Sequence, residues 1–420
     1  MTTRNKIINI IKLHTLQPHA FFFLLINMVY LLPIILAIAI DFREGDVHLV
    51  LNFDIEILKK IVSIYLIAIL SFIFGTVLWS WARKSCNKNE SEPFISMVYP
   101  LTNYYYIPLI IVSLIFLMTK IALIPKGAYN AYAFDTDAMT GGIWTFSMFC
   151  SEILVFMSIP VILSSRKNKW LIFALVALIS SVNLLHGTRF FFIIMMILPC
   201  YYLYISNKIK FSTLLLYSPL VIISLLFLSY LIFLKRSNVD VGWVHFDFLK
   251  IISPVMYESI FSQMSLINVL ANNVWSDFGS IHNLFLDIFY LTIPRILFPN
   301  KDEVQFIADY AYLSPMGAFS GYAHGLLYLG YFYWIFYLVL GFVGSYLYEK
   351  AKYSSVFFVL YVYYVCDFLF RVMRDGYIIP SKMLINCIIM FFILILYEKY
   401  AKSILIQIIK NKQMLSKRLI

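Results

Sequence analysis

The residues Ile293-Pro294-Arg295-Ile296-Leu297-Phe298-Pro299-Asn300-Lys301 lie in the one long interruption of a sequence that is otherwise almost continuously apolar. The interruption runs from Lys235 to Tyr322 and separates seven apolar stretches from three that follow it. Two prolines fix the backbone around Arg295, and its apolar neighbours partly withdraw the guanidinium from water. A guanidinium held in this way is suited to bind an anion.

The composition is that of a polytopic membrane protein. Of the 420 residues, 62% are hydrophobic and 13% are charged, and the mean hydropathy is +0.83, which exceeds the apolar content of ordinary soluble domains. The net charge of +11 is expected from basic cytoplasmic loops, so we expect no nucleic-acid partner. The five cysteines include no C-x-x-C spacing, so no metal site is expected.

Apolar runs of about 17 to 25 residues predict ten membrane-spanning helices. The fold class expected is therefore an all-α polytopic membrane protein with one long periplasmic loop that contains amphipathic helices. The spans are predicted at about 20–40, 60–82, 101–124, 142–164, 169–186, 189–206, 212–234, 323–348, 354–371 and 377–397. They define an N-terminal membrane domain (1–234), an external loop (235–322) and a C-terminal membrane domain with a basic tail (323–420).

The placement of Lys and Arg predicts the orientation. Basic residues gather in every second connection, and we assign these connections to the cytoplasm: Arg4, Lys6, Lys12, Arg83, Lys84, Lys88, Arg166, Lys167, Lys169, Lys208, Lys210, Lys350 and Lys352, with a basic segment after Glu398. Acidic residues dominate the first two connections between them, at Asp41, Glu44, Asp46, Asp54, Glu56, Asp135 and Asp137. Both termini are therefore predicted to be cytoplasmic and the long loop external.

Two helices are predicted inside the loop. Between Pro254 and Val274, apolar residues recur at helical spacing opposite Glu258, Ser262, Ser265 and Asn272, which predicts an amphipathic helix at the outer membrane interface. A second, shorter helix is predicted over 281–291, ending before Pro294.

Ionisable residues inside apolar spans are costly, and so their positions indicate function. They are Lys120, Glu152, Asp367, Arg371 and Lys382. Further charged or titratable residues lie at the predicted outer turns, namely His186, Arg189, His324, Arg374 and Asp375. A polar cavity that opens outward beneath the loop explains this distribution.

Several of these residues have a structural alternative. Asp367 and Arg371 are four residues apart and could form an ion pair on one helix. Glu152 could pair with Lys120 or Lys382. Arg189 could contact lipid headgroups, and Arg295 could bind a lipid phosphate instead of a substrate phosphate. His324 could be an interfacial histidine without a catalytic role.

Outward-facing arginines around one cavity suit a phosphate or a pyrophosphate, because guanidinium donates paired hydrogen bonds. The sequence contains no P-loop, G-x-S-x-G or H-E-x-x-H motif, so a nucleotide-driven enzyme is not expected. A substrate on the outer side must then carry its own leaving group, as a sugar on polyprenyl pyrophosphate does.

Four features of the sequence resemble those of the Wzy-type O-antigen polymerases. They are the segment at 293–301, the P-x-G that follows it, the S-G-Y-A-H-G of 320–325 with its Tyr- and Gly-rich continuation, and the Gly187-Thr188-Arg189 that precedes a span. The motif similarity is confined to about 190–345. Members often have Gly-Glu-x-Tyr where this chain has Gly325-Leu326-Leu327-Tyr328, and this difference leaves His324 as the nearest titratable group.

The resemblance implies an enzyme of the bacterial inner membrane that acts on the periplasmic or exterior side in O-antigen or capsular polysaccharide synthesis. It would transfer a growing glycan from undecaprenyl pyrophosphate to the next lipid-linked repeat unit, with membrane lipid and a chain-length regulator protein as partners and with no cofactor. We expect Arg189, Arg295, Arg371 and Arg374 to bind the pyrophosphate. The proton of the acceptor hydroxyl is expected to pass to His324, or alternatively to Asp375 or Glu258.

Two other functions remain open. An O-antigen ligase would share the loop and the arginines but deliver the glycan to lipid A core. A flippase or other transporter would show internal repeats and discontinuous helices near the midplane, and the sequence shows neither feature.

Overall fold

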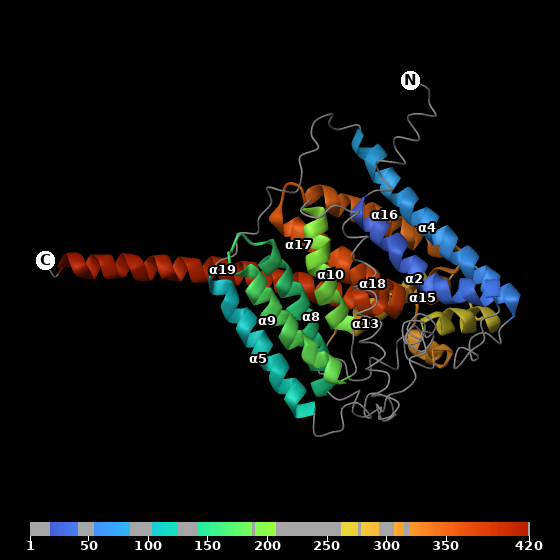
Figure 1. Cartoon of the computed structure of the whole chain (residues 1–420), viewed down its shortest axis with the longest axis horizontal. Helices are drawn as coiled ribbons and strands as arrows, with labels where there is room; N and C mark the ends of the chain where they lie inside the picture. Colours follow the sequence, from blue (N-terminus) through green and yellow to red (C-terminus); the bar gives the residue numbers. More distant parts are fainter. Residues whose placement is uncertain are drawn as a thin grey trace. The chain divides into compact units, whose positions relative to one another are not determined.

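A computed structural model describes residues 17–40, 54–84, 103–123, 142–186, 190–206, 262–275, 279–293, 306–314 and 319–418. Every regular element in these ranges is a helix (Figure 1), which confirms the all-α prediction. Among them, five apolar runs are long enough to cross a membrane: Ile55–Ala82, Phe146–Leu163, Gly321–Lys350, Ser355–Asp375 and Ile378–Tyr397. Shorter apolar helices cover four more predicted spans, at Pro18–Leu32, Tyr106–Ala122, Lys169–Leu184 and Phe190–Ile205. The helices are those of a membrane protein, and the predicted span at 212–234 lies outside the described residues.

The chain forms two compact units, which are described separately. Unit 1 comprises Met1–Met97 and Cys200–Lys382, and unit 2 comprises Val98–Pro199 and Met383–Ile420. The labelled helices of unit 1 are α2 (Pro18–Ile40), α4 (Ile55–Lys84), α13 (Ile281–Thr292), η6 (Phe306–Leu313), α15 (Gly321–Leu329), η7 (Gly330–Phe332), α16 (Tyr333–Lys350), α17 (Ser355–Tyr363), η8 (Tyr364–Phe368) and α18 (Leu369–Asp375). Those of unit 2 are η3 (Asn103–Tyr105), α5 (Tyr106–Leu123), α8 (Gly142–Leu163), α9 (Lys169–Ser181) and η5 (Val182–His186). Helices α10 (Phe190–Ile205) and α19 (Ile378–Arg418) contain residues of both units.

Helices α4 and α16 of unit 1 pack extensively against each other (Figure 1). A Cβ atom on Gly75 would collide with the carbonyl of Leu338, and one on Gly341 would collide with the carbonyl of Phe72. Glycine at both positions lets the two backbones approach closely, as small residues do between membrane helices.

Polar contacts at the two ends of this pair show that α4 and α16 run in the same direction. The hydroxyl of Tyr333, the first residue of α16, donates over 3.4 Å to the carbonyl of Ile64 in the third turn of α4. Near their last turns, the indole N–H of Trp79 donates to Glu349 over 3.0 Å.

Helices α2 and α17 run in the opposite direction. On α2, His19 lies 3.3 Å from the hydroxyl of Ser345, whereas the ring of Phe23 packs near Tyr337, two turns earlier in α16. On α17 and its continuation, the rings of Tyr361 and Tyr348 lie 5.3 Å apart, and the hydroxyl of Tyr364 donates to the carbonyl of Leu340.

The run Gly321–Lys350 is a helical hairpin rather than one straight helix. The rings of Tyr322 and Tyr337 stack with centroids 5.1 Å apart, although fifteen residues of continuous helix would separate them by about 22 Å. The chain reverses at Gly330, whose φ is +55°, so that α15 returns along the first turns of α16. The predicted span at 323–348 is therefore broken near its start, at Gly330, and its continuous part is α16.

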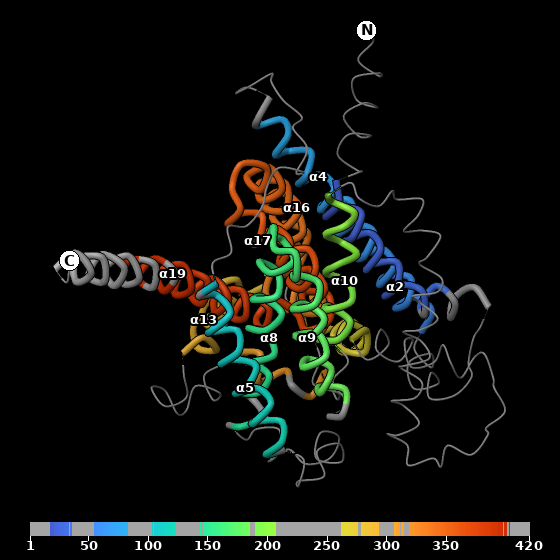
Figure 2. Tube along the Cα trace, turned by 60° about the vertical axis from the view of Figure 1, so that its left-hand side comes forward, coloured from blue at the N-terminus to red at the C-terminus, as the bar shows by residue number. Residues whose placement is uncertain are grey.

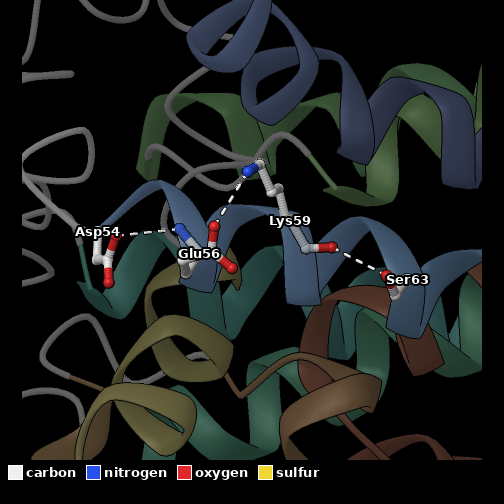
Figure 3. A network of polar contacts seen from close by, with 4 residues as sticks. All are labelled: Asp54, Glu56, Lys59 and Ser63. Atoms are coloured by element: carbon white, nitrogen blue, oxygen red, sulfur yellow. Dashed lines mark hydrogen bonds and ion pairs between the residues drawn. The ribbon is translucent and has the colours of Figure 1, made fainter.

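Helix α4 begins with a charged turn (Figure 3), at the end of unit 1 where the α15–α16 hairpin reverses. The carboxylate of Asp54 accepts a hydrogen bond from the main-chain N–H of Glu56 over 3.1 Å, and so caps the helix. Lys59 pairs with Glu56 over 3.0 Å, and both side chains are more than half exposed. We call this end of unit 1, formed by the first turns of α4, by α15 and by the end of α18, the site end.

In unit 2, helices α5, α8 and α9 lie side by side (Figures 1 and 2). The ammonium group of Lys169 donates to the carbonyls of Ile162 and Ser164, each over 2.8 Å, where α8 ends and α9 begins. Near the other end, the side chains of Ser151 and Asn183 form a buried hydrogen bond of 3.2 Å. Helices α8 and α9 are therefore antiparallel, as the predicted hairpin of spans requires.

Candidate functional site

His324 lies in α15 with its ring against the turn that follows α18. The main-chain N–H of Tyr377 donates to Nδ1 of His324 over 3.0 Å. Gly376 has a φ of +77°, and a Cβ atom at this position would collide with the imidazole. Glycine is therefore needed here for the conformation and for the space, and the histidine is held by the turn.

This contact fixes the tautomer of the imidazole. A main-chain N–H can only donate, so Nδ1 must accept, and the neutral ring then carries its proton on Nε2. Within the described residues Nε2 is buried without a hydrogen-bond partner, and the whole side chain is 3% exposed. In this arrangement His324 can donate a hydrogen bond, whereas the predicted role as a base requires Nδ1 to leave Tyr377 or the proton to move.

Arg374 and Asp375 precede the same turn. Their side chains lie 3.6 Å apart and are 23% and 14% exposed, respectively. Gly376 and Tyr377, which contact the His324 ring, follow Asp375 directly in the sequence. The structure thus places Arg374 and Asp375 directly before the turn that His324 contacts.

Arg371 lies one turn earlier and forms the ion pair that its spacing allowed. Its Nε lies 3.1 and 3.0 Å from the two carboxylate oxygens of Asp367, and both side chains are buried. Asp367 belongs to η8, which is a π-helical turn between α17 and α18. Single π-turns inside α-helices often occur at functional sites.

Asp287 is a residue that the sequence analysis missed. Its side chain is 1% exposed, and it accepts hydrogen bonds from the main-chain N–H groups of Phe306 (2.9 Å) and Ile307 (3.0 Å). It also accepts a bond of 2.5 Å from the hydroxyl of Tyr328. One buried carboxylate therefore ties two helices of the loop region, α13 and η6, to α15. The signal in the sequence was an acid at helical spacing among the apolar residues Leu284, Ile288 and Leu291.

A buried set of polar side chains surrounds the start of α15. The hydroxyl of Tyr322 donates to Asn27, and the side chain of Gln263 donates to the hydroxyl of Tyr65. The main-chain N–H of Ser320 donates to Ser265 over 3.0 Å. The first and third bonds hold the start of α15 against α2 and the helical stretch 262–271, and the second joins that stretch to α4.

The same bonds correct one prediction about the loop. Ser262 and Ser265 were expected on the polar face of an interfacial helix, but they are 1% and 0% exposed. The described part of this helix, 262–271, is therefore a core element, and its polar side chains meet polar groups of the protein instead of water.

The remaining predicted residues divide into two groups. Arg189, Arg295 and Glu258 lie outside the described residues, and their roles stay predictions. Lys120 and Glu152 are buried on the packed helices α5 and α8 of unit 2, as expected if Glu152 has a structural role.

The described chemistry at the site end consists of a buried N–H donor, a partly exposed arginine and a partly exposed carboxylate. Such a set can bind an anion and accept a proton nearby. Within the described residues no group of three His, Cys, Asp or Glu side chains is arranged to hold a metal ion. Comparison with known proteins finds no protein-family profile, curated sequence or solved structure that matches the chain.

Proposed function

We propose that this protein is a glycosyltransferase that polymerises lipid-linked oligosaccharide repeat units on the outer side of the bacterial inner membrane, in O-antigen or capsular polysaccharide synthesis. It would move the growing glycan from polyprenyl pyrophosphate to a sugar hydroxyl of the next repeat unit. The observation that carries the proposal is the gathering of His324, Arg374 and Asp375 around one turn at the site end.

The proposal includes ten spans, a periplasmic loop and cytoplasmic termini. The relative helix directions support this topology, because alternation requires α2 and α17 to run one way and α4 and α16 the other. The charged first turn of α4 at the site end agrees with an aqueous outer surface there.

In the proposed reaction the bond between the anomeric carbon and the pyrophosphate oxygen breaks while the acceptor oxygen bonds to that carbon. Arg374, with Arg371, Arg189 and Arg295, would stabilise the negative charge that develops on the pyrophosphate. The carboxylate of Asp375 is partly exposed and is therefore the better placed base among the described residues. The Nε2–H of His324 would then orient the substrate by donating a hydrogen bond.

The test is a clean deletion in a host that makes lipopolysaccharide and uses this protein for its O-antigen. Loss of a polymerase leaves transport and ligation intact, so gels should show core capped by one repeat unit and no ladder of longer chains. Bare core would contradict the proposal, because a missing flippase or ligase prevents any repeat unit from reaching the core. The wild-type gene supplied on a plasmid should restore the ladder.

A further inference from the structure

Helix α13 presents a stripe of large apolar side chains that nothing in the described structure covers. Ile281, Phe285 and Phe289 are 55%, 66% and 58% exposed. They are spaced four residues apart, so they lie on one face of the helix. The helix contains no Lys or Arg, and its one acid, Asp287, is buried on the other side.

The rotation of α13 is fixed, so this stripe cannot turn inward. Asp287 lies roughly opposite the stripe on a helix of 3.6 residues per turn, and its carboxylate is bound by Tyr328 and by the first N–H groups of η6. Leu284, which is 6% exposed, packs on the same inner side. Turning the stripe inward would break these bonds and expose a buried carboxylate.

The attachment of α13 sets its level along the helices of unit 1. The main-chain N–H of Ser280 donates to the carbonyl of Tyr328 over 2.7 Å, so α13 begins beside the reversal of the α15–α16 hairpin. The first residue of α16 meets Ile64 of α4, about one turn below the charged segment that ends at Lys60. Helix α13 therefore starts at the boundary between the charged beginning of α4 and its apolar remainder.

The hairpin to which α13 is bonded also carries exposed apolar side chains. Tyr331 and Phe332 follow the end of α15 and are 58% and 44% exposed. Along α16, Ile335 and Val339 are 40% and 47% exposed, as expected of side chains that face lipid. Exposed apolar side chains thus follow the bond between Ser280 and Tyr328 on both helices that it joins, α13 and the α15–α16 hairpin.

We infer that α13 is an interfacial membrane helix, with Ile281, Phe285 and Phe289 inserted among the acyl chains of the lipid leaflet at the site end. An amphipathic helix at this level buries its apolar stripe at the boundary between headgroups and acyl chains. Its inner side anchors the loop region to α15 through Asp287, so the membrane and the protein together fix the helix. The inference does not depend on the proposed glycan transfer.

The test uses spin labels attached to single introduced cysteines in the full-length protein, reconstituted in vesicles of phosphatidylethanolamine and phosphatidylglycerol. The spectrum of the labelled parent protein, which keeps its native cysteines, is subtracted. Labels at Phe285→Cys and Phe289→Cys probe the stripe. Two labels on α4 calibrate the measurement: Glu56→Cys, where the side chain is 65% exposed in the charged turn, and Leu70→Cys, where it is 65% exposed in the apolar part.

Collision with oxygen, which concentrates in lipid, is compared with collision with a water-soluble nickel chelate. We expect labels at 285 and 289 to resemble the label at 70, with oxygen collisions several-fold more frequent relative to nickel than at 56. A ratio equal to that at 56 would overturn the inference by placing the stripe in water. Low collision rates with both reagents would also overturn it, because they would show that protein covers the stripe.

Discussion

The N–H of Tyr377 and the Nδ1 of His324 are joined by a hydrogen bond of 3.0 Å between the turn after α18 and helix α15, 53 residues apart in the sequence. The bond uses the lone pair of Nδ1, so the only other polar atom of the ring, Nε2, carries the proton. One ring nitrogen of His324 is therefore held by a structural bond, whereas the other is buried without a partner in the described residues, and substitutions can separate their roles.

Replacing His324 with asparagine should keep the structural contact and remove the Nε2–H. The amide oxygen of asparagine can accept the Tyr377 N–H, so the thermal stability of the purified protein should change little. Polymer synthesis, measured by the ladder of glycan chains, should fall about 100-fold, a typical effect of losing a group that assists proton transfer or orients substrate.

The matched variant His324→Ala removes both atoms. It leaves the Tyr377 N–H buried without a partner, which costs about 1–3 kcal/mol, so it should lower both stability and polymer yield. Near-normal polymer in His324→Asn would show that the residue has only a structural role.

The buried pair of Asp367 and Arg371 can be tested for a structural role against a functional one. Asp367→Asn removes the negative charge that faces the buried guanidinium, and breaking a buried ion pair costs about 3–5 kcal/mol. Replacing both residues, as Asp367→Leu with Arg371→Met, should restore most of the stability, because apolar residues can substitute for a buried ion pair.

Polymer synthesis by the double variant then distinguishes the two roles. If Arg371 binds pyrophosphate, the double variant should be stable in detergent and inactive in cells. Activity within about twofold of wild type would assign the pair to structure alone. Protein amounts in the membrane, measured by immunoblot, provide the control.

The ion pair of Asp367 and Arg371 was predictable from the sequence, but the backbone around it was not. Residues four apart on a helix face each other, so the sequence correctly offered an ion pair between Asp367 and Arg371. The π-turn around Asp367 was not predictable, because a single π-helical turn leaves the sequence of polar and apolar residues along the span unchanged.

The reversal at Gly330 was missed for a related reason. Residues 321–350 have the length and hydropathy of a single span, and hydropathy carries no information about direction. The positive φ at Gly330 and the tight contacts at Gly321 and Gly325 depend on tertiary packing. The helical stretch 262–271 shows the same limit, because polar residues at helical spacing can face either water or a buried polar group.

Asp287 should stabilise the packing of α13 and η6 against α15, and a double-mutant cycle can measure the contribution of its hydrogen bond to Tyr328. Asp287→Asn replaces one acceptor oxygen with a donor, so it should lower stability by about 1–3 kcal/mol. Tyr328→Phe removes only one hydrogen bond and should cost less. If the two residues act through the same bond, the double variant should be less destabilised than the sum of the single variants.

The cycle is read from thermal unfolding of the purified protein in detergent. Tyr331→Phe is a suitable control, since Tyr331 is 58% exposed and its replacement should leave stability unchanged. Strict additivity of Asp287→Asn and Tyr328→Phe would show that the two side chains are not coupled.

The proposed orientation can be tested with alkaline phosphatase, which is active only when it is exported from the cytoplasm. Fusion after Asp277, in the loop region, should give high activity. Fusion after Lys167 should give background activity, because that segment between α8 and α9 is assigned to the cytoplasm by its basic residues.

A third fusion, after Tyr353 between α16 and α17, should also be inactive, because the parallel packing of α4 and α16 puts this turn at the same end of unit 1 as the basic end of α4. Amounts of each fusion protein are compared by immunoblot, so that low activity is not mistaken for low expression. Activity after Lys167 or Tyr353 combined with inactivity after Asp277 would place the site end in the cytoplasm, where a periplasmic glycan polymerase cannot work.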